Sequence, residues 1–161
     1  DDVYLDDAAL QTKLQRAHRH NGFHLIGVAG CLEPTIQHPS LWHLMAPRHQ
    51  LRGSVQYFHN NDESRGCVFY GPSPSPADLL DGLFLAVHVP SALATGWRFN
   101  ERFRFHHYDL AASLDAHRHG MRTGVAPIQL IHASPGLGNL EDPEWKPSDL
   151  LFRQLYAPSP A

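Results

Sequence analysis

The sequence predicts an α/β fold, and four stretches of it carry that prediction. The runs at 23–30 (FHLIGVAG) and 84–89 (FLAVHV) are short and apolar, as buried strands are. A helix is predicted from Asp109 to about His119, where Gly120 would end it. A β-rich return over 123–131 follows that helix. Strand, helix and returning strand together indicate a sheet with helices packed on it.

Composition limits the kind of protein further. A chain of 161 residues suits one domain with its own core. The net charge of −3 gives no basic field for binding nucleic acid, and no apolar run is long enough to predict a transmembrane segment. Cys31 and Cys67 are too few for a disulfide framework, so we expect reduced thiols and a cytoplasmic protein.

The first fifty residues predict a strand end, a helix and a loop. Val3–Leu5 follows two acidic residues and is apolar enough for a strand end. Asp6 or Asp7 would cap a helix running to about His20, which Asn21-Gly22 ends. The segment 31–50 has two prolines and no sustained period, so a long loop is expected there.

The middle and the end of the chain predict a hairpin and several short elements. Strands at 52–59 and 67–70 would pair across a polar turn, and the proline-rich segment 71–76 would form a loop. Pro127 would place the returning strand at a sheet edge. Two short helices complete the expected elements, one beginning near Pro90 and ending at Gly96, the other a docking helix near 150–155.

Two chemically useful side chains should come close together. Asp109 begins the main helix and His132 ends the returning strand, and a helix-to-strand connection can return one to the other. Asp109 is either a general base or an ordinary helix cap, and the two roles are compatible. His132 is either a metal ligand or a hydrogen-bonded histidine at a strand end. Asp81-Gly82 is either a ligand-binding loop or a turn.

Three segments resemble a known family in the same order along the chain. FRFHHYDLAASLDAHRHGMRTGVAPIQLIHAS, at 103–134, resembles the C-terminal half of a family-2-like glycosyltransferase of the GT-A fold. It is most similar to small bacterial proteins with an F-x-F-x-x-Y-D segment and a late I-x-H-x-S. DDVYLDDAALQTKLQRA, at 1–17, resembles the acidic metal motif and its following helix. LLDGLFLAV, at 79–87, resembles the glycine-containing loop that approaches the sugar donor.

The resemblance implies a truncated GT-A-like (Rossmann-like) mixed sheet flanked by helices. Residues 1–135 would be the C-terminal, acceptor-side portion, with the nucleotide-binding half missing, and 136–161 would be a Pro/Gly-rich tail with a short docking helix. The implied reaction is inverting transfer of a sugar from a nucleotide-sugar donor to a hydroxyl acceptor. A truncated sheet would also leave an open edge, which predicts self-association of the chain.

The resemblance also assigns roles to individual residues. Asp109 would be the catalytic base, while Asp1, Asp2 and His132 would hold a divalent metal, Mn²⁺ or Mg²⁺. Donor and acceptor binding is expected at five further residues: Asp81, Gly82, Trp97, His107 and Tyr108. His107 is expected there because it lies beside Tyr108, and for Trp97 the alternative is packing in the core or in a lid. This sequence departs from the family pattern at Tyr108, where relatives often carry an acidic residue, and at Ala111, where they often carry a second aspartate.

Two other classes of function remain open from the sequence. A non-catalytic remnant or interaction module would keep part of the fold without turnover. A metal-dependent hydrolase using histidine and aspartate is less well supported, because the 13 histidines form no compact ligand motif.

Overall fold

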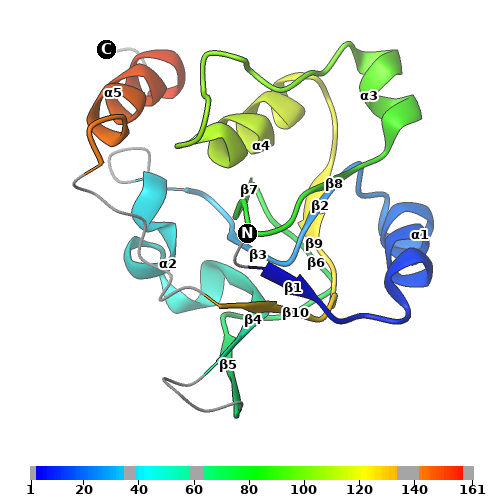
Figure 1. The fold of residues 1–161 in the computed structure, drawn as a ribbon. Helices are drawn as coiled ribbons and strands as arrows, with labels where there is room; N and C mark the ends of the chain where they lie inside the picture. Colours follow the sequence, from blue (N-terminus) through cyan, green and yellow to red (C-terminus); the bar gives the residue numbers. More distant parts are fainter. Residues whose placement is uncertain (1–2, 35–38, 59–63, 134–141, 158–161) are drawn as a thin grey trace.

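The computed structural model describes residues 3–34, 39–58, 64–133 and 142–157, and it confirms an α/β fold with a mixed, curled sheet flanked by helices (Figure 1). The helices are α1 (Leu10–Asn21), α2 (Trp42–Met45), α3 (Val89–Thr95), α4 (Tyr108–Arg118) and α5 (Trp145–Tyr156), with 3₁₀ turns at Pro39–Leu41 and Arg48–Gln50. The strands are β1 (Val3–Leu5), β2 (Leu25–Gly27), β3 (Ala29–Cys31), β4 (Leu51–Phe58), β5 (Arg65–Phe69), β6 (Ser75–Pro76), β7 (Leu79–Leu80), β8 (Ala86–Val87), β9 (Thr123–Val125) and β10 (Leu130–His132).

The strands form two sheets. The larger sheet has the order β1-β10-β4-β3-β7, with β5 also paired to β4, and the smaller sheet has the order β6-β9-β2-β8. The pairs β10–β4 and β2–β9 are parallel, and the remaining pairs are antiparallel. The β4–β5 pairing confirms the predicted hairpin. Each sheet is therefore mixed, because it contains one parallel pair of strands among antiparallel pairs.

The predicted single strand at 23–30 is instead two strands, β2 and β3, one in each sheet. The division falls at Val28, whose C=O accepts a hydrogen bond from the N–H of Ser54 at 3.1 Å. The preceding residue of β4, Gly53, has a φ of +86°, and a Cβ there would lie 1.9 Å from the Val28 oxygen. The close crossing of β4 at Val28 redirects the chain, and apolarity alone does not reveal it.

The prediction of a buried central strand over 84–89 is wrong. Only Ala86–Val87 is a strand there, and β8 is half-buried at the edge of the smaller sheet. The buried strand lies a few residues earlier, at β7, where Leu79 and Leu80 are fully buried. A turn at Asp81-Gly82 separates the two, because both of these residues are held by side chains from elsewhere in the chain.

The returning strand of 123–131 is also divided, and neither half lies at an edge. β9 pairs with β2 and β6, while β10 lies between β1 and β4. Pro127 lies in the connection between β9 and β10, where its missing N–H removes no bond between strands. Two expected loops likewise contain structure: α2 and the 3₁₀ turns lie within 31–50, and β6 pairs with β9 within 71–76.

The helix ends follow the predictions more closely than the helix starts. Glycines in the left-handed conformation follow α1 and α3, and Gly120 lies just beyond α4 with a φ of +70°. Ala9, not Asp6 or Asp7, occupies the N-cap position of α1. His107 takes that position in α4, so Asp109 lies in the first turn rather than at the cap.

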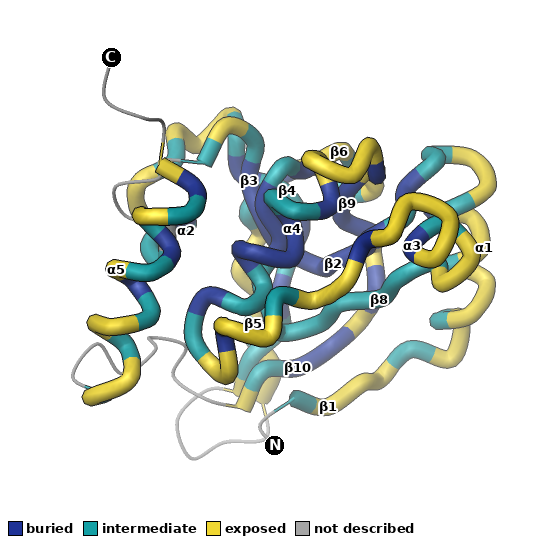
Figure 2. The backbone as a smooth tube through the Cα atoms, turned by 90° about the horizontal axis from the view of Figure 1, so that it is seen from above, coloured by how far each residue is buried: buried dark blue, intermediate teal, exposed yellow. Residues whose placement is uncertain are grey.

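The helix α4 lies at the centre of the packing. Figure 1 shows it above the strands, between α3 and α5, and Figure 2 shows α4, β2 and β3 among the buried segments. Most of its buried side chains are small: Ala111, Ala112, Ser113 and Ala116 are all 0% exposed, and Leu110 is the larger buried residue beside them. Small side chains allow the helix axis to approach β7 closely. None of the helices in the described ranges is long and apolar enough to cross a membrane.

Replacing Gly53 with alanine should be severely destabilising, because its backbone conformation is strained for other residues and the new Cβ would collide with the Val28 oxygen. We expect the free energy of unfolding to fall by roughly 3 kcal/mol or more, or folding to fail. Gly96→Ala is the matched control, since its φ is +73° but nothing lies within 4 Å of its Cβ position. That control should lose only about 1 kcal/mol. Chemical denaturation measures both, and equal losses would contradict the steric argument.

Candidate functional site

Two aspartates from segments far apart in the sequence meet beside Gly82, and together they are called the carboxylate pair here: Asp81 and Asp109. Asp81 directly follows β7, and its N–H donates to the Ala29 C=O at 3.0 Å. Asp109 lies in the first turn of α4. Both residues are partly buried and keep some contact with solvent. A carboxylate that is crowded by protein yet reachable from solvent is suited to proton transfer.

The backbone of Gly82 is held at both of its polar groups by the start of α4. Its N–H donates to Asp109 Oδ2 at 2.7 Å, and its C=O accepts from the Tyr108 hydroxyl at 3.0 Å. A Cβ at this position would lie 2.6 Å from the Tyr108 oxygen and 2.9 Å from Asp109 Oδ2. Only glycine therefore allows this approach between the turn and the helix.

A third contact joins the same helix to β7 itself. The N–H of Leu80 donates to Ser113 Oγ at 3.0 Å, and that hydroxyl donates to the Asp109 C=O at 2.8 Å. Ser113 is fully buried, and its bond with Leu80 is shielded from water. The position of Asp109 relative to the turn is thus fixed by contacts on both sides of it.

The second carboxylate, Asp81, is surrounded by polar and aromatic side chains. Its Oδ1 accepts from the Leu83 N–H at 3.1 Å, and its Oδ2 accepts from Trp42 Nε1 at 3.3 Å. The Trp42 ring lies 5.2 Å from that of Tyr70, measured between centroids. His43 also lies close enough for the two charges to interact, since the Asp81 carboxylate opposes the lowering of the His43 pKa that burial causes.

Burial and mutual repulsion raise the pKa of both carboxyl groups. Burial is the larger cause for Asp109, and the charge of Asp81 adds to it, raising the pKa of Asp109 to about 7. Burial also raises the pKa of Asp81, but hydrogen bonds from Leu83 and Trp42 oppose that change. With a pKa of about 7, Asp109 exchanges its proton near neutral pH. Burial, then the charges of Asp109 and Asp81, raise the pKa of Tyr108 to about 12, so its hydroxyl stays protonated.

His132 is a further predicted site residue that lies in this region. It ends β10, is partly buried, and its charge favours the ionised form of Asp81. The register of β1 and β10 pairs Val3 with His132. Asp1 and Asp2 lie outside the described residues. Across 3–34, 39–58, 64–133 and 142–157, no group of three or more His, Cys, Asp or Glu side chains is placed to hold a metal ion.

Two of the predicted binding residues, Trp97 and His107, are buried and form hydrogen bonds within the protein. Trp97 is 5% exposed, and its Nε1 donates to the Ala112 C=O at 3.2 Å. His107 is 4% exposed and lies between two hydroxyls, with Nε2 2.7 Å from Ser40 Oγ and Nδ1 2.9 Å from Ser148 Oγ. Burial lowers the pKa of His107 to about 4, so the ring is neutral at physiological pH. Trp97 packs in the core, and His107 joins the start of α4 to α5 and to the 3₁₀ turn before α2.

The residues that surround Asp81 are not connected with it by any pattern in the sequence, although Trp42 is a candidate there for stacking on a sugar. Trp42 and His43 fall in a segment expected to be loop, and Tyr70 was expected only to pair across a hairpin. Trp42 and Asp81 are 39 residues apart, so no local pattern connects them. The one available signal was a tryptophan in a polar segment, which indicates burial or stacking without a partner.

No protein-family model and no curated protein sequence matches this chain.

The charge of Asp81 should be measurable in the titration of Asp109. Asp81→Asn removes a neighbouring negative charge while keeping side-chain size, so the pKa of Asp109 should fall below about 7. Carboxyl carbon shifts followed by NMR over pH 3–9 give this pKa directly. Asp6→Asn is the control, because Asp6 is exposed and paired with Arg65, and it should leave the Asp109 titration unchanged. An Asp109 pKa that is insensitive to Asp81→Asn would show that the two carboxylates do not interact.

Proposed function

We propose that this protein transfers a sugar from a nucleotide-sugar donor to a hydroxyl acceptor, with Asp109 as the general base. The observation that carries the proposal is the position of the Asp109 carboxylate, which is partly accessible, lies beside Asp81 and accepts from the Gly82 N–H at 2.7 Å. Burial there raises its pKa to about 7. A base with a pKa near the working pH is ionised often enough to act and still basic enough to take a proton. The resemblance of 103–134 to a glycosyltransferase segment supports the same residue in the same role.

The proposed reaction is a single displacement with inversion at the sugar. The acceptor oxygen forms a bond to the anomeric carbon as the bond from that carbon to the donor diphosphate breaks. The electron pair of the broken bond leaves with the diphosphate, and the acceptor proton passes to Asp109. The Gly82 N–H, 2.7 Å from Asp109 Oδ2, holds that carboxylate in position while it receives the proton.

Asp81 has a separate role in this proposal. Its Oδ1 and Oδ2 accept hydrogen bonds from Leu83 and Trp42, so its orientation is fixed. Carboxylate oxygens have further acceptor capacity, which suits them to sugar hydroxyls. Its negative charge also keeps the pKa of Asp109 high. Asp81 would therefore both bind sugar and adjust the strength of the base.

The expected divalent metal would be held by Asp1, Asp2 and His132. Val3, which directly follows Asp2 in the sequence, pairs with His132, and His132 lies near the carboxylate of Asp81. An imidazole nitrogen together with carboxylate oxygens is a donor set that Mn²⁺ accepts. When bound, such an ion would supply positive charge to the leaving diphosphate.

Asp109→Asn should abolish most of the transfer while leaving the fold intact. The amide oxygen can still accept from the Gly82 N–H, but the side chain can no longer accept a proton. We expect turnover to fall by roughly 10²–10⁴-fold with little change in donor binding. Nucleotide release from a panel of nucleotide-sugars measures the turnover, and Asp6→Asn serves as the control. Near-normal turnover in Asp109→Asn would show that Asp109 is not the base and has only a structural role.

His132→Ala should weaken the binding of Mn²⁺, measured by calorimetry rather than by activity. The effect should be larger in the presence of a nucleoside diphosphate, because its oxygens complete the coordination shell. His20→Ala is the control, since it removes an exposed imidazole from α1. Equal Mn²⁺ affinity for wild type and His132→Ala would remove His132 from the metal site.

A further inference from the structure

The segment leading into α4 carries cationic and aromatic side chains that the fold does not use. Arg102 and Arg104 are exposed, and neither guanidinium forms a hydrogen bond or ion pair with any residue in the described part of the chain. Phe105, between them and α4, is 69% exposed. Arginines without partners beside an exposed ring are poorly explained by stability, and they are a common composition of binding surfaces.

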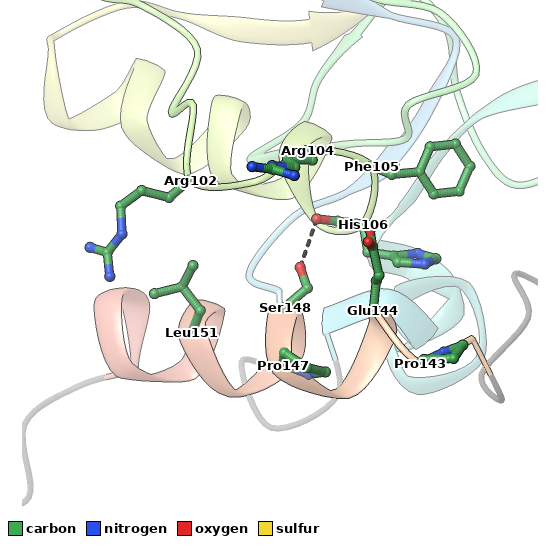
Figure 3. A pocket seen from close by; sticks show the side chains of 9 residues that line it. All are labelled: Arg102, Arg104, Phe105, His106, Pro143, Glu144, Pro147, Ser148 and Leu151. Carbon is green, nitrogen blue, oxygen red and sulfur yellow. Dashed lines mark hydrogen bonds between the residues drawn. The ribbon is translucent and has the colours of Figure 1, made fainter.

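These residues form one wall of a groove, and α5 forms the other. The groove has a volume of about 360 Å³, within the range of small-ligand sites. Figure 3 shows Arg102 reaching toward Leu151 of α5, with Arg104 along the rim and Phe105 at the end opposite Arg102. The two walls are joined by a hydrogen bond from Ser148 Oγ to the His106 C=O at 2.8 Å. This bond fixes the distance between the two walls at that point.

The charges around the groove favour an anion of modest charge. Arg102 and Arg104 bring two positive charges, and Glu144 at the other wall brings one negative charge. The His106 ring lies 3.2 Å from Asp142, so its nitrogen already faces a carboxylate. Planar guanidinium groups match carboxylates in two-point hydrogen bonds, while Glu144 disfavours a doubly charged phosphate monoester. The exposed ring of Phe105 offers an apolar face to the C–H side of a sugar.

The groove also lies next to the segment that leads into α4. His106 lines it, His107 caps the helix, and Asp109 lies in the first turn. The His107 ring, 2.9 Å from Ser148 Oγ, joins the helix start to the second wall. The groove and Asp109 are therefore only three residues apart along the chain, since His106 lines the groove.

We propose that this groove binds the acceptor, and that the acceptor is an oligosaccharide whose sugars carry carboxylates, such as a chain of uronic acids. Arg102 and Arg104 pair with carboxylates of the chain, and Phe105 packs on a sugar ring. The hydroxyl to be glycosylated then lies at the end of the chain nearest Asp109. Calling the bound oligosaccharide the acceptor rests on the proposed sugar transfer, but its binding to the groove needs neither donor nor turnover.

The test is calorimetric titration of the protein with tetragalacturonic acid, without donor, at low salt. The matched ligand is the same tetrasaccharide with its carboxylates converted to methyl esters. We expect the acid to bind at least about tenfold more tightly than the ester, and Arg102→Gln/Arg104→Gln to abolish that preference. Arg16→Gln/Arg19→Gln removes the same charge from exposed positions on α1 and should keep the preference.

Three results would overturn the inference. They are equal binding of acid and ester, an equal loss of binding in the α1 control, and tighter binding of a phosphorylated tetrasaccharide than of the uronic acid chain. The outcome is separable from that of the proposed function. Uronate binding that depends on Arg102 and Arg104, in a protein without transfer activity, would support the groove and contradict the transferase. Transfer activity without such binding would support the transferase and contradict the groove as the acceptor site.

Discussion

The two hydrogen bonds between the start of α4 and the Gly82 backbone are the constraint on which the rest of the site depends. One hydrogen bond from Tyr108 and one to Asp109 engage the C=O and the N–H of the same glycine. These bonds end β7, separate it from β8, and bring two aspartates that are 28 positions apart in sequence to one place. A side chain at Gly82 would interrupt both bonds, so the turn, the helix start and the carboxylate pair form a single unit.

The packing of α4 connects this local geometry to chemistry. Its buried face contains three alanines and Ser113 beside Leu110, and the serine hydroxyl accepts a hydrogen bond from the N–H of Leu80 in β7. A helix with bulkier side chains would stand further from the strand and leave Asp109 in water. Close approach instead removes water from the carboxyl group, and this desolvation is the largest cause of its raised pKa. The core and the candidate base are thus consequences of the same small residues.

Features set by neighbouring residues could be predicted from the sequence, and features set by distant contacts could not. Glycine ends α1 and α3 as expected, and the hairpin of β4 and β5 follows from alternation across a polar turn. The division of the apolar run at Val28 depends on Gly53 crossing it, and nothing within the run signals that crossing. Asp109 was recognisable as a candidate, but the bond from Trp42 to its partner Asp81 spans 39 residues.

In the proposed reaction, Asp109 works as a base because its proton equilibrium lies near neutral pH. The pH dependence of kcat/KM for sugar transfer tests it most directly, since this quantity reports the ionisation of the free enzyme. A raised carboxyl pKa means that the active, ionised form accumulates only as pH rises toward 7. We therefore predict that kcat/KM increases with pH and levels off above about 7. A rate that is already constant from pH 5 upward would contradict the account.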